Sequence, residues 1–266
     1  MNDKMSLGQY IPGNTFIHRL DPRVKIFLTV FYMVALFYIN NILMYIPVVI
    51  YLGLIIYIAK LKPIKILKSL KPLLFIIVFT SILNILVIPG KELFSIWKIK
   101  VTDEGLYMAF FMSLRIVLLV AGTSLLTLTT STIRLTDGLE SIFSPLKIIR
   151  FPAHEIAMMI SIALRFIPTL FEEADKIRKA QMARGADFDS GNLFKKAQSM
   201  IPLLVPLFLN SFRRADELAV AMVSRCYRGS YGRTRLNPLK MQIMDYITVV
   251  SASIFFVTII VSKKFI

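Results

Sequence analysis

Long apolar runs, separated by segments dense in charge, constrain this 266-residue chain more than any other feature of its sequence. The hydrocarbon core of a bilayer is about 30 Å thick, so a helix needs about 20 mostly apolar residues to cross it. Backbone amides and carbonyls find no water there, and a helix satisfies them within itself. We therefore expect an all-α membrane protein with about five transmembrane helices. The candidate spans lie near residues 25–40, 42–59, 73–89, 105–130 and 243–262.

The basic residues predict which side of the membrane each segment occupies. Of the 32 Lys and Arg residues, 26 lie before the first span, in the loop 60–71, or between Arg134 and Lys240, whereas 5 lie in segments on the opposite side. Cytoplasmic loops of membrane proteins carry an excess of Lys and Arg. We therefore expect a cytoplasmic N-terminus and a C-terminus outside. The net charge of +16 has the same origin, because no nucleic-acid-binding motif accompanies it, and we expect no nucleic-acid partner.

The chain divides into three regions by composition. Residues 1–130 hold the first four spans, residues 131–240 form a basic cytoplasmic region, and residues 241–266 hold the last span. The basic region is predicted to contain about three helices, near 137–148, 152–184 and 192–225, of which the second and third are long and amphipathic.

Local signals place the ends of two of these helices. Asp137 and Glu140 stand at capping-box spacing, which predicts a helix start there. Pro152 suits the first turn of the second helix, and Gly185 is a natural stop at its end.

The long helices have apolar centres near 156–171 and 200–212, and the sequence leaves open whether these dip into the bilayer. Two spanning helices would place the basic segment 172–199 outside, against the charge bias. Their uninterrupted apolar runs are also short for a crossing. We expect both helices at or below the membrane surface, with their apolar stripes against lipid headgroups or partner proteins.

Each long helix ends on an arginine between small residues. A guanidinium offers a rigid fork of donors, and small neighbours let it enter a groove on a partner. One such end would be an ordinary solvated helix end, whereas two on adjacent helices favour docking. The two tripeptides are Ala183-Arg184-Gly185 and Ser224-Arg225-Cys226.

Four other residues carry narrower expectations. Arg115 lies within the fourth span, where a charge is costly, and we predict a structural role in which it caps carbonyls or pairs within the fold. Lys25 is expected to extend its ammonium group to the interface. Cys226 is expected to be a small packing residue. His154 lacks a second histidine at metal-binding spacing, so we expect no metal site.

Several segments, taken in order and spacing, resemble the transmembrane coupling (T) component of energy-coupling factor transporters, a branch of the ATP-binding-cassette importers. The resemblance covers nearly the whole chain. The matching segments are HRLDPRVK at 18–25, TLTTST at 127–132, SPLK at 144–147, the run 161–188 that includes the first tripeptide, and the second tripeptide.

The resemblance implies a non-catalytic coupling subunit in the plasma membrane of a prokaryote, with 131–240 as a cytoplasmic coupling domain. The two tripeptides would dock into grooves on two ATPase subunits, expected as a heterodimer, which bind ATP and Mg²⁺; this chain would bind no cofactor. The apolar faces of the long helices would hold a small membrane subunit that binds a vitamin or other micronutrient. Candidate contacts with that subunit are Ile160, Ile167, Leu204, Leu207 and Phe208.

The chain lacks GxxxxGK[ST], so an ATP-driven transporter needs its nucleotide site on another subunit. Three alternatives to the vitamin importer stay open. The T component of a dedicated cobalt or nickel importer satisfies the same pattern. A stand-alone secondary carrier or channel would need paired halves with broken helices, and no such repeat occurs in the sequence. A lipid-modifying enzyme would need acids or histidines clustered at the membrane face, whereas the acids here are spread along helices.

Overall fold

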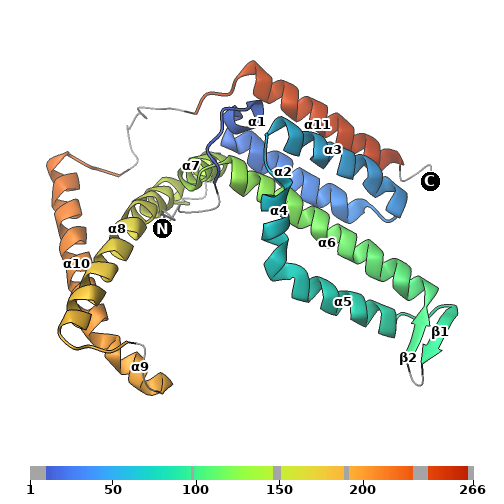
Figure 1. Ribbon diagram of the computed structural model, residues 1–266. Coiled ribbons are helices and arrows are strands. Elements are labelled where there is room, and N and C mark those ends of the chain that lie inside the picture. Colours follow the sequence, from blue (N-terminus) through green and yellow to red (C-terminus); the bar gives the residue numbers. More distant parts are fainter. Residues whose placement is uncertain (1–9, 97–98, 146–150, 189–191, 230–238, 263–266) are drawn as a thin grey trace. The chain divides into compact units, whose positions relative to one another are not determined.

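A computed structural model of the chain describes residues 10–96, 99–145, 151–188, 192–229 and 239–262 (Figure 1). The described residues divide between two units. Within these ranges, we name the first the bundle (residues 10–138 and 239–262) and the second the arm (residues 139–229).

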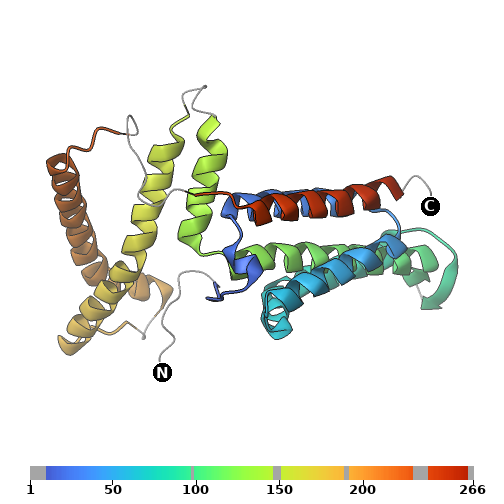
Figure 2. The ribbon, with the colours of Figure 1, turned by 90° about the horizontal axis from the view of Figure 1, so that it is seen from above.

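The bundle is built mainly from apolar helices that run side by side, as the two ribbon views agree (Figures 1 and 2). In both views α2, α6 and α11 lie along nearly the same axis. Its helices are α1 (Phe16–Arg19), α2 (Pro22–Tyr38), η1 (Ile42–Met44), α3 (Tyr45–Ile58), α4 (Pro63–Leu70), η2 (Lys71–Leu73), α5 (Leu74–Val87), α6 (Asp103–Thr129) and α11 (Ile243–Ser262).

The predicted fold class is confirmed. Among the described residues, four helices are long and apolar enough to cross a membrane, and Ile42–Ile58 is a shorter apolar helix. The four are Pro63–Val87, Asp103–Thr129, Ala153–Ala183 and Ile243–Ser262. The third of these is the predicted helix near 152–184, and its mean hydropathy of 1.3 is the lowest of the four. Length and composition therefore permit a crossing there, and its surface position stays a prediction.

An aromatic cluster lies where α2, α3 and α11 meet. The Phe256 ring packs edge-on against Tyr32 at 5.8 Å and against Tyr51 at 5.2 Å between ring centroids. The Tyr32 hydroxyl donates to the Leu118 carbonyl of α6 at 2.8 Å, so its polar end is satisfied inside the bundle. Gly122 of α6 lies against the same ring, where a Cβ would overlap Tyr32 Cε1. The close approach of α2 and α6 thus requires glycine.

The outer faces of these helices are also apolar. In α5, for example, no residue is buried, and Phe75 is 78% exposed. A soluble protein rarely exposes so continuous an apolar surface. These faces therefore suit contact with lipid tails.

A hairpin between α5 and α6 was not predicted from the sequence. Strands β1 (Glu92–Ile96) and β2 (Ile99–Thr102) pair antiparallel, with Ile96 opposite Ile99. The segment is rich in β-branched and aromatic residues, which favour strands. Thr102 ends the hairpin and starts α6, since its hydroxyl donates to the Ile88 carbonyl and accepts from the Gly105 amide.

The arm contains α8 (Ala153–Ala183), α9 (Leu193–Ser199) and α10 (Ile201–Ser224), while α7 (Thr132–Phe143) has residues in both units. The helix predicted near 192–225 is interrupted at Met200, so a single helix there is wrong. Pro202 is the reason, because it lacks the amide that would continue the helix and suits the first turn of a new one.

The capping box predicted at Asp137 and Glu140 is also wrong. Helix α7 begins at Thr132, and the Ser131 carbonyl and hydroxyl accept from the amides of its first turn. Asp137 and Glu140 therefore lie inside the helix. The helix ends before Pro145, and residues 146–148 of the predicted helix lie outside the described residues.

We expect Gly122→Ala to destabilise the bundle by about 1–3 kcal/mol, the usual cost of overpacking a core. The new Cβ would overlap the Tyr32 ring unless α2 and α6 move apart. Thermal unfolding of the purified chain in detergent measures the effect as a lower Tm. Gly53→Ala is the matched control, because a Cβ at Gly53 meets nothing within 4 Å, and its Tm should not fall. An unchanged Tm for Gly122→Ala would contradict the close contact.

Candidate functional site

A defined backbone turn ends α8, and Arg184 is the capping residue directly after the last helical residue, Ala183. The Gly185 amide donates to the Met182 carbonyl, and the Ala186 amide donates to the Gln181 carbonyl, both at 3.0 Å. These two bonds form the Schellman motif, which needs a left-handed residue directly after the cap. Gly185 has φ +88°, a conformation that glycine adopts at little cost. The helix therefore ends where Gly185 predicts.

The same turn ends α10, although the sequence there is different. The Cys226 amide donates to the Val223 carbonyl at 2.9 Å, and the Tyr227 amide donates to the Met222 carbonyl at 3.0 Å. Cys226 occupies the left-handed position with φ +56°. Its side chain is exposed, so its prediction as a packing residue is wrong. Arg184 and Arg225 thus stand at the same position of the same backbone motif.

All six residues of the two tripeptides (Ala183-Arg184-Gly185 and Ser224-Arg225-Cys226) are exposed. In the described parts of the chain, neither the Arg184 nor the Arg225 guanidinium has a hydrogen-bond or ion-pair partner. Each guanidinium carries five N–H donors and no acceptor. Both arginines can therefore bind carboxylates or carbonyls of another molecule without first breaking a bond in this chain.

Polar side chains join α8 to α10 along an antiparallel seam. Glu173 accepts from Asn210 Nδ2 at 2.5 Å and from Arg214 at 3.3 Å. Arg214 also donates to the Thr169 hydroxyl at 2.8 Å and lies over the Phe166 ring. These bonds between charged and polar partners hold the two long helices in one register. The seam could not be predicted from the sequence, because the pairing depends on how the helices cross.

The antiparallel arrangement separates the two arginine ends. Gln181, close to the end of α8, donates to the Pro202 carbonyl at the start of α10. Arg184 therefore lies near the first turn of α10, whereas Arg225 caps the opposite end of α10. At 1.5 Å per residue, the two ends are about 35 Å apart. The two ribbon views agree that the helices cross and that their C-terminal ends lie apart (Figures 1 and 2).

The predicted contacts for a membrane subunit lie on the two long helices. Ile160 on α8, and Leu204 and Phe208 on α10, are exposed, while Ile167 and Leu207 are partly buried. Other large apolar side chains are exposed on the same helices. They include Met159, Phe171, Val205, Leu209, Phe212, Val220 and Val223. Exposed apolar area of this extent marks a surface that contacts a partner or a membrane.

In the bundle, the Lys25 ammonium group is buried and joins three chain segments. Lys25 Nζ donates to the His18 carbonyl at 3.3 Å, the Thr129 carbonyl at 3.0 Å and the Thr130 hydroxyl at 3.1 Å. The side chain is 7% exposed, so the expectation that it extends to the interface is wrong. Inward acceptors satisfy all three of its donors. Two segments that carry the resemblance, 18–25 and 127–132, therefore meet at this group.

Two buried carboxylates tie the start of α2 to the start of α11. Asp21 accepts from the Arg23 amide and caps α2, with Pro22 at the first position of the helix. Asp245 of α11 accepts from the Asp21 amide at 2.9 Å and from the Gln242 amide at 2.8 Å. Carboxylates at helix N-termini are favourable because they accept from free amides. We call Asp21, Lys25, Thr129, Thr130 and Asp245 the polar clasp.

His18 is packed beside the polar clasp. Its Nδ1 lies 2.6 Å from the Thr15 hydroxyl, and its ring lies against Gly13. Burial, with a smaller contribution from the Lys25 ammonium, lowers the pKa of His18. A neutral ring is thus favoured at neutral pH, and protonation in acid would destabilise this region, since a group with a depressed pKa binds its proton more weakly when folded.

Arg115 of α6 is held by polar groups from neighbouring segments. Its Nε donates to the Tyr45 hydroxyl at 2.9 Å, and its terminal nitrogen donates to the Ile39 carbonyl at 2.6 Å. The guanidinium lies 4.7 Å from the centroid of the Phe111 ring. These contacts cap a helix-end carbonyl and satisfy a charge inside the bundle. Elsewhere, His154 pairs with Glu140 at 2.9 Å.

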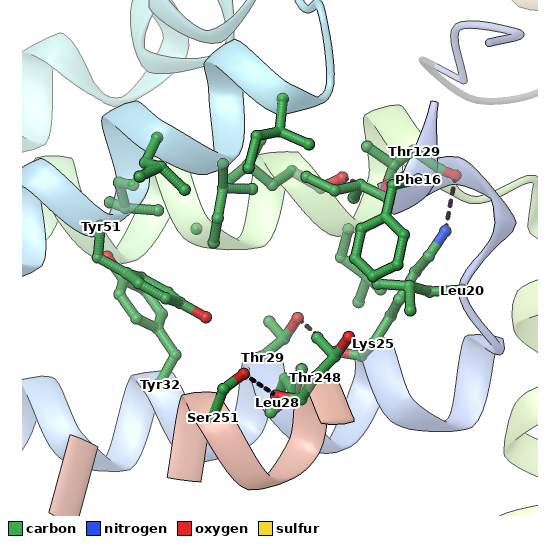
Figure 3. Close-up of a pocket in the computed structure, with 18 of the residues that line it drawn as sticks. Phe16, Leu20, Lys25, Leu28, Thr29, Tyr32, Tyr51, Thr129, Thr248 and Ser251 are labelled. Carbon is green, nitrogen blue, oxygen red and sulfur yellow. Dashed lines mark hydrogen bonds between the residues drawn. The ribbon is translucent and has the colours of Figure 1, made fainter. Parts of the chain in front are cut away.

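An apolar cavity of about 340 Å³ lies between α1, α2, α3, α6 and α11 (Figure 3). Its polar groups are largely committed to the helices that carry them. The hydroxyls of Thr29, Thr129, Thr248 and Ser251 each donate to a backbone carbonyl of their own helix. Lys25 points its ammonium group at Thr129 rather than into the cavity centre (Figure 3). The cavity therefore offers an apolar surface rather than a set of catalytic groups.

Comparison with known proteins identifies relatives along the whole chain. The family model described as "Cobalt transport protein" (CbiQ) matches residues 13–236. A protein of Thermosediminibacter oceani is 50% identical over 260 residues, which cover 98% of both chains. A protein of Clostridium kluyveri is 52% identical over 262 residues and 97% of both chains. A Bacillus subtilis protein is 44% identical over 252 residues, 94% of this chain and 95% of its own. All three are named "Energy-coupling factor transporter transmembrane protein EcfT".

We expect Lys25→Met to destabilise the bundle by about 1–3 kcal/mol, because buried carbonyls of His18 and Thr129 would lose their donor. The measurement is the Tm of the purified chain in detergent. Lys240→Met is the matched control, since Lys240 is exposed, and it should melt as the wild type does. Equal Tm values for the two variants would contradict the structural role of the Lys25 ammonium group.

Proposed function

The chain belongs to the cobalt transport protein (CbiQ) family, as a transmembrane component of energy-coupling factor transporters, and we propose that it couples two ATPase subunits to a substrate-binding membrane subunit. Two exposed arginines, set on the same backbone turn at opposite ends of a cross-linked helix pair, carry this proposal. The resemblance found in the sequence is confirmed at the level of the family. The chain is a multi-pass membrane component of a complex.

The two arginine ends are the proposed ATPase docking sites. Arg184 would enter a groove on one ATPase subunit and Arg225 a groove on the other, each flanked by small residues that avoid a clash. The separation of about 35 Å supports two separate partners rather than one shared groove. ATP and Mg²⁺ would bind to those subunits, so this chain would be non-catalytic and carry no cofactor.

The proposed mechanism is mechanical. When the ATPase subunits close on ATP, they would move the ends of α8 and α10 relative to each other. The seam of Glu173, Asn210 and Arg214 supports transmission, because it holds the helices together at their crossing. Motion at the end of one helix would then also move the apolar face of the other helix.

The apolar faces of α8 and α10 are the proposed surface for the small substrate-binding subunit. Ile160, Leu204 and Phe208 support this role by their exposure. Ile167 and Leu207 would complete the surface from partly buried positions. Movement of these faces would tilt the bound subunit and release its substrate inward.

We propose the same topology that the charge bias predicts: a cytoplasmic N-terminus, residues 131–240 as a cytoplasmic coupling domain, and a C-terminus outside in a prokaryotic plasma membrane. The proposed role is uptake of vitamins or other micronutrients. A cobalt or nickel importer is the second candidate, favoured by the description of the family model. Identification of the substrate-binding subunit that co-purifies with the chain distinguishes the two.

We expect Arg184→Glu and Arg225→Glu each to weaken ATPase docking and the double variant to abolish it. Each reversal replaces five donors with a carboxylate in a groove that would accept a cation. The measurement is recovery of the ATPase pair in a pull-down with the tagged chain.

Arg213→Glu is the matched control for charge. Arg213 is exposed on α10, about three turns before Arg225, and the substitution reverses the same charge away from the proposed site. The control should recover the ATPase pair as the wild type does. Full recovery by the double variant would disprove the docking assignment.

We expect residues 172–199 to lie in the cytoplasm. A single cysteine at Lys176, in a chain with Cys226 replaced by serine, should resist a membrane-impermeant thiol reagent in intact cells and react after permeabilisation. Lys91→Cys in the same background is the control and should react in intact cells, because the proposed topology places it outside. Labelling at residue 176 from outside would contradict the topology.

A further inference from the structure

Helix α4 has three distinct faces. Ile66 and Leu70 are buried, and Ser69 approaches Ser124 of α6 with 2.7 Å between hydroxyl oxygens, so one face packs on α6. Ile64 and Leu67, each 62% exposed, form an apolar face without cover. The third is the basic face: Lys65 and Lys68 lie on the helix, and Lys62 and Lys71 cap its two ends.

The basic face is unneutralised. All four lysines are exposed, and the segment 60–71 contains no acidic residue. In the described ranges, none of the four has an ion-pair partner. Lys65 and Lys68, three residues apart, lie on one side of the helix, and Lys62 and Lys71 stand directly before and after it. Four adjacent positive charges favour an anionic ligand.

The direction of α4 (Figure 1) and its contact near the end of α6 suit a helix that lies at a membrane boundary. Figure 1 shows α4 turned away from the common direction of α5 and α6. Ser124, which α4 contacts, lies five residues before the end of α6, which is about 7 Å along that helix. Amphipathic helices that lie in the interface bury their apolar face by about 5–10 Å. Under the proposed topology, in which the end of α6 lies at the cytoplasmic boundary, α4 lies at this depth.

The apolar face continues onto surface that suits lipid tails. Directly after α4 and η2, the exposed residues Leu74, Phe75 and Val78 begin α5. An acidic protein partner would match the lysines but would leave Ile64 and Leu67 without an apolar neighbour. A bilayer satisfies both faces at once, since phosphates lie directly above hydrocarbon. The combination therefore favours lipid over protein.

We propose that the basic face of α4 binds the phosphate headgroups of anionic glycerophospholipids while Ile64 and Leu67 enter the hydrocarbon of the same leaflet. The four lysines select anionic over zwitterionic headgroups, because each basic residue near a membrane surface adds about 1 kcal/mol of attraction to anionic lipid. The site is independent of ATPase docking. Under the proposed topology it lies in the cytoplasmic leaflet.

The test is a local fluorescence measurement on the full-length chain in vesicles. Leu67→Trp is made with Trp97→Phe, so that the introduced indole is the only one in the chain. The chain is reconstituted in phosphatidylcholine with increasing fractions of brominated phosphatidylglycerol or brominated phosphatidylcholine. Both lipids should quench the introduced indole, and the phosphatidylglycerol should associate at least about fivefold more strongly. Raised salt should reduce this ratio, because screening weakens exposed charges.

Two sets of variants separate charge from fold. Changing all four lysines to glutamine should bring the ratio of phosphatidylglycerol to phosphatidylcholine association close to one. Changing all four to arginine should preserve this ratio. Val78→Trp in the Trp97→Phe background is the position control and should be quenched equally by both lipids. Equal quenching by the two lipids in the Leu67→Trp chain would overturn the proposal. Absence of quenching by either would overturn it as well, and would leave a protein partner as the occupant.

Discussion

The buried Lys25 ammonium group is the interaction on which the bundle depends. A charge withdrawn from water is costly unless every donor finds a partner. Lys25 meets that condition by donating to His18, Thr129 and Thr130, which join the segment before α2 to the end of α6. Asp245 completes the polar clasp by accepting from the Asp21 amide, which brings in α11. Three helices distant in sequence are thereby fixed at one end of the bundle.

The arm depends on a different principle, the repeated geometry of helix ends. Gly185 and Cys226 have unlike side chains but occupy the same left-handed position, and each leaves an exposed arginine directly before it. Cys226 holds this conformation without the freedom of glycine, at a cost of about 1 kcal/mol. The two proposed docking sites therefore share one backbone turn, although the residues after the arginines, Gly185 and Cys226, differ. The seam at Glu173 and Arg214 holds the ends apart and in register.

Most of the helices could be predicted from the sequence, because hydropathy and length act locally. The spans predicted near 42–59 and 105–130 correspond to Ile42–Ile58 and Asp103–Thr129. The errors arose where local signals competed. Ser131 caps α7, so the helix starts before the predicted capping box at Asp137. Pro202 divides a helix that the apolar periodicity alone would predict to continue. The hairpin at Glu92–Thr102 was missed because short strands resemble loops in a single sequence.

By itself the sequence determined the membrane class, the helical architecture, the family resemblance and the arginine at each long helix end, because each follows from residues close in the chain. The tertiary structure decided which polar groups meet. It turned Lys25 inward to Thr129 rather than outward to the interface, and it paired Arg214 with Glu173 and Arg115 with the Ile39 carbonyl. Such partners are separated by tens of residues, so helix packing alone brings them within hydrogen-bonding distance.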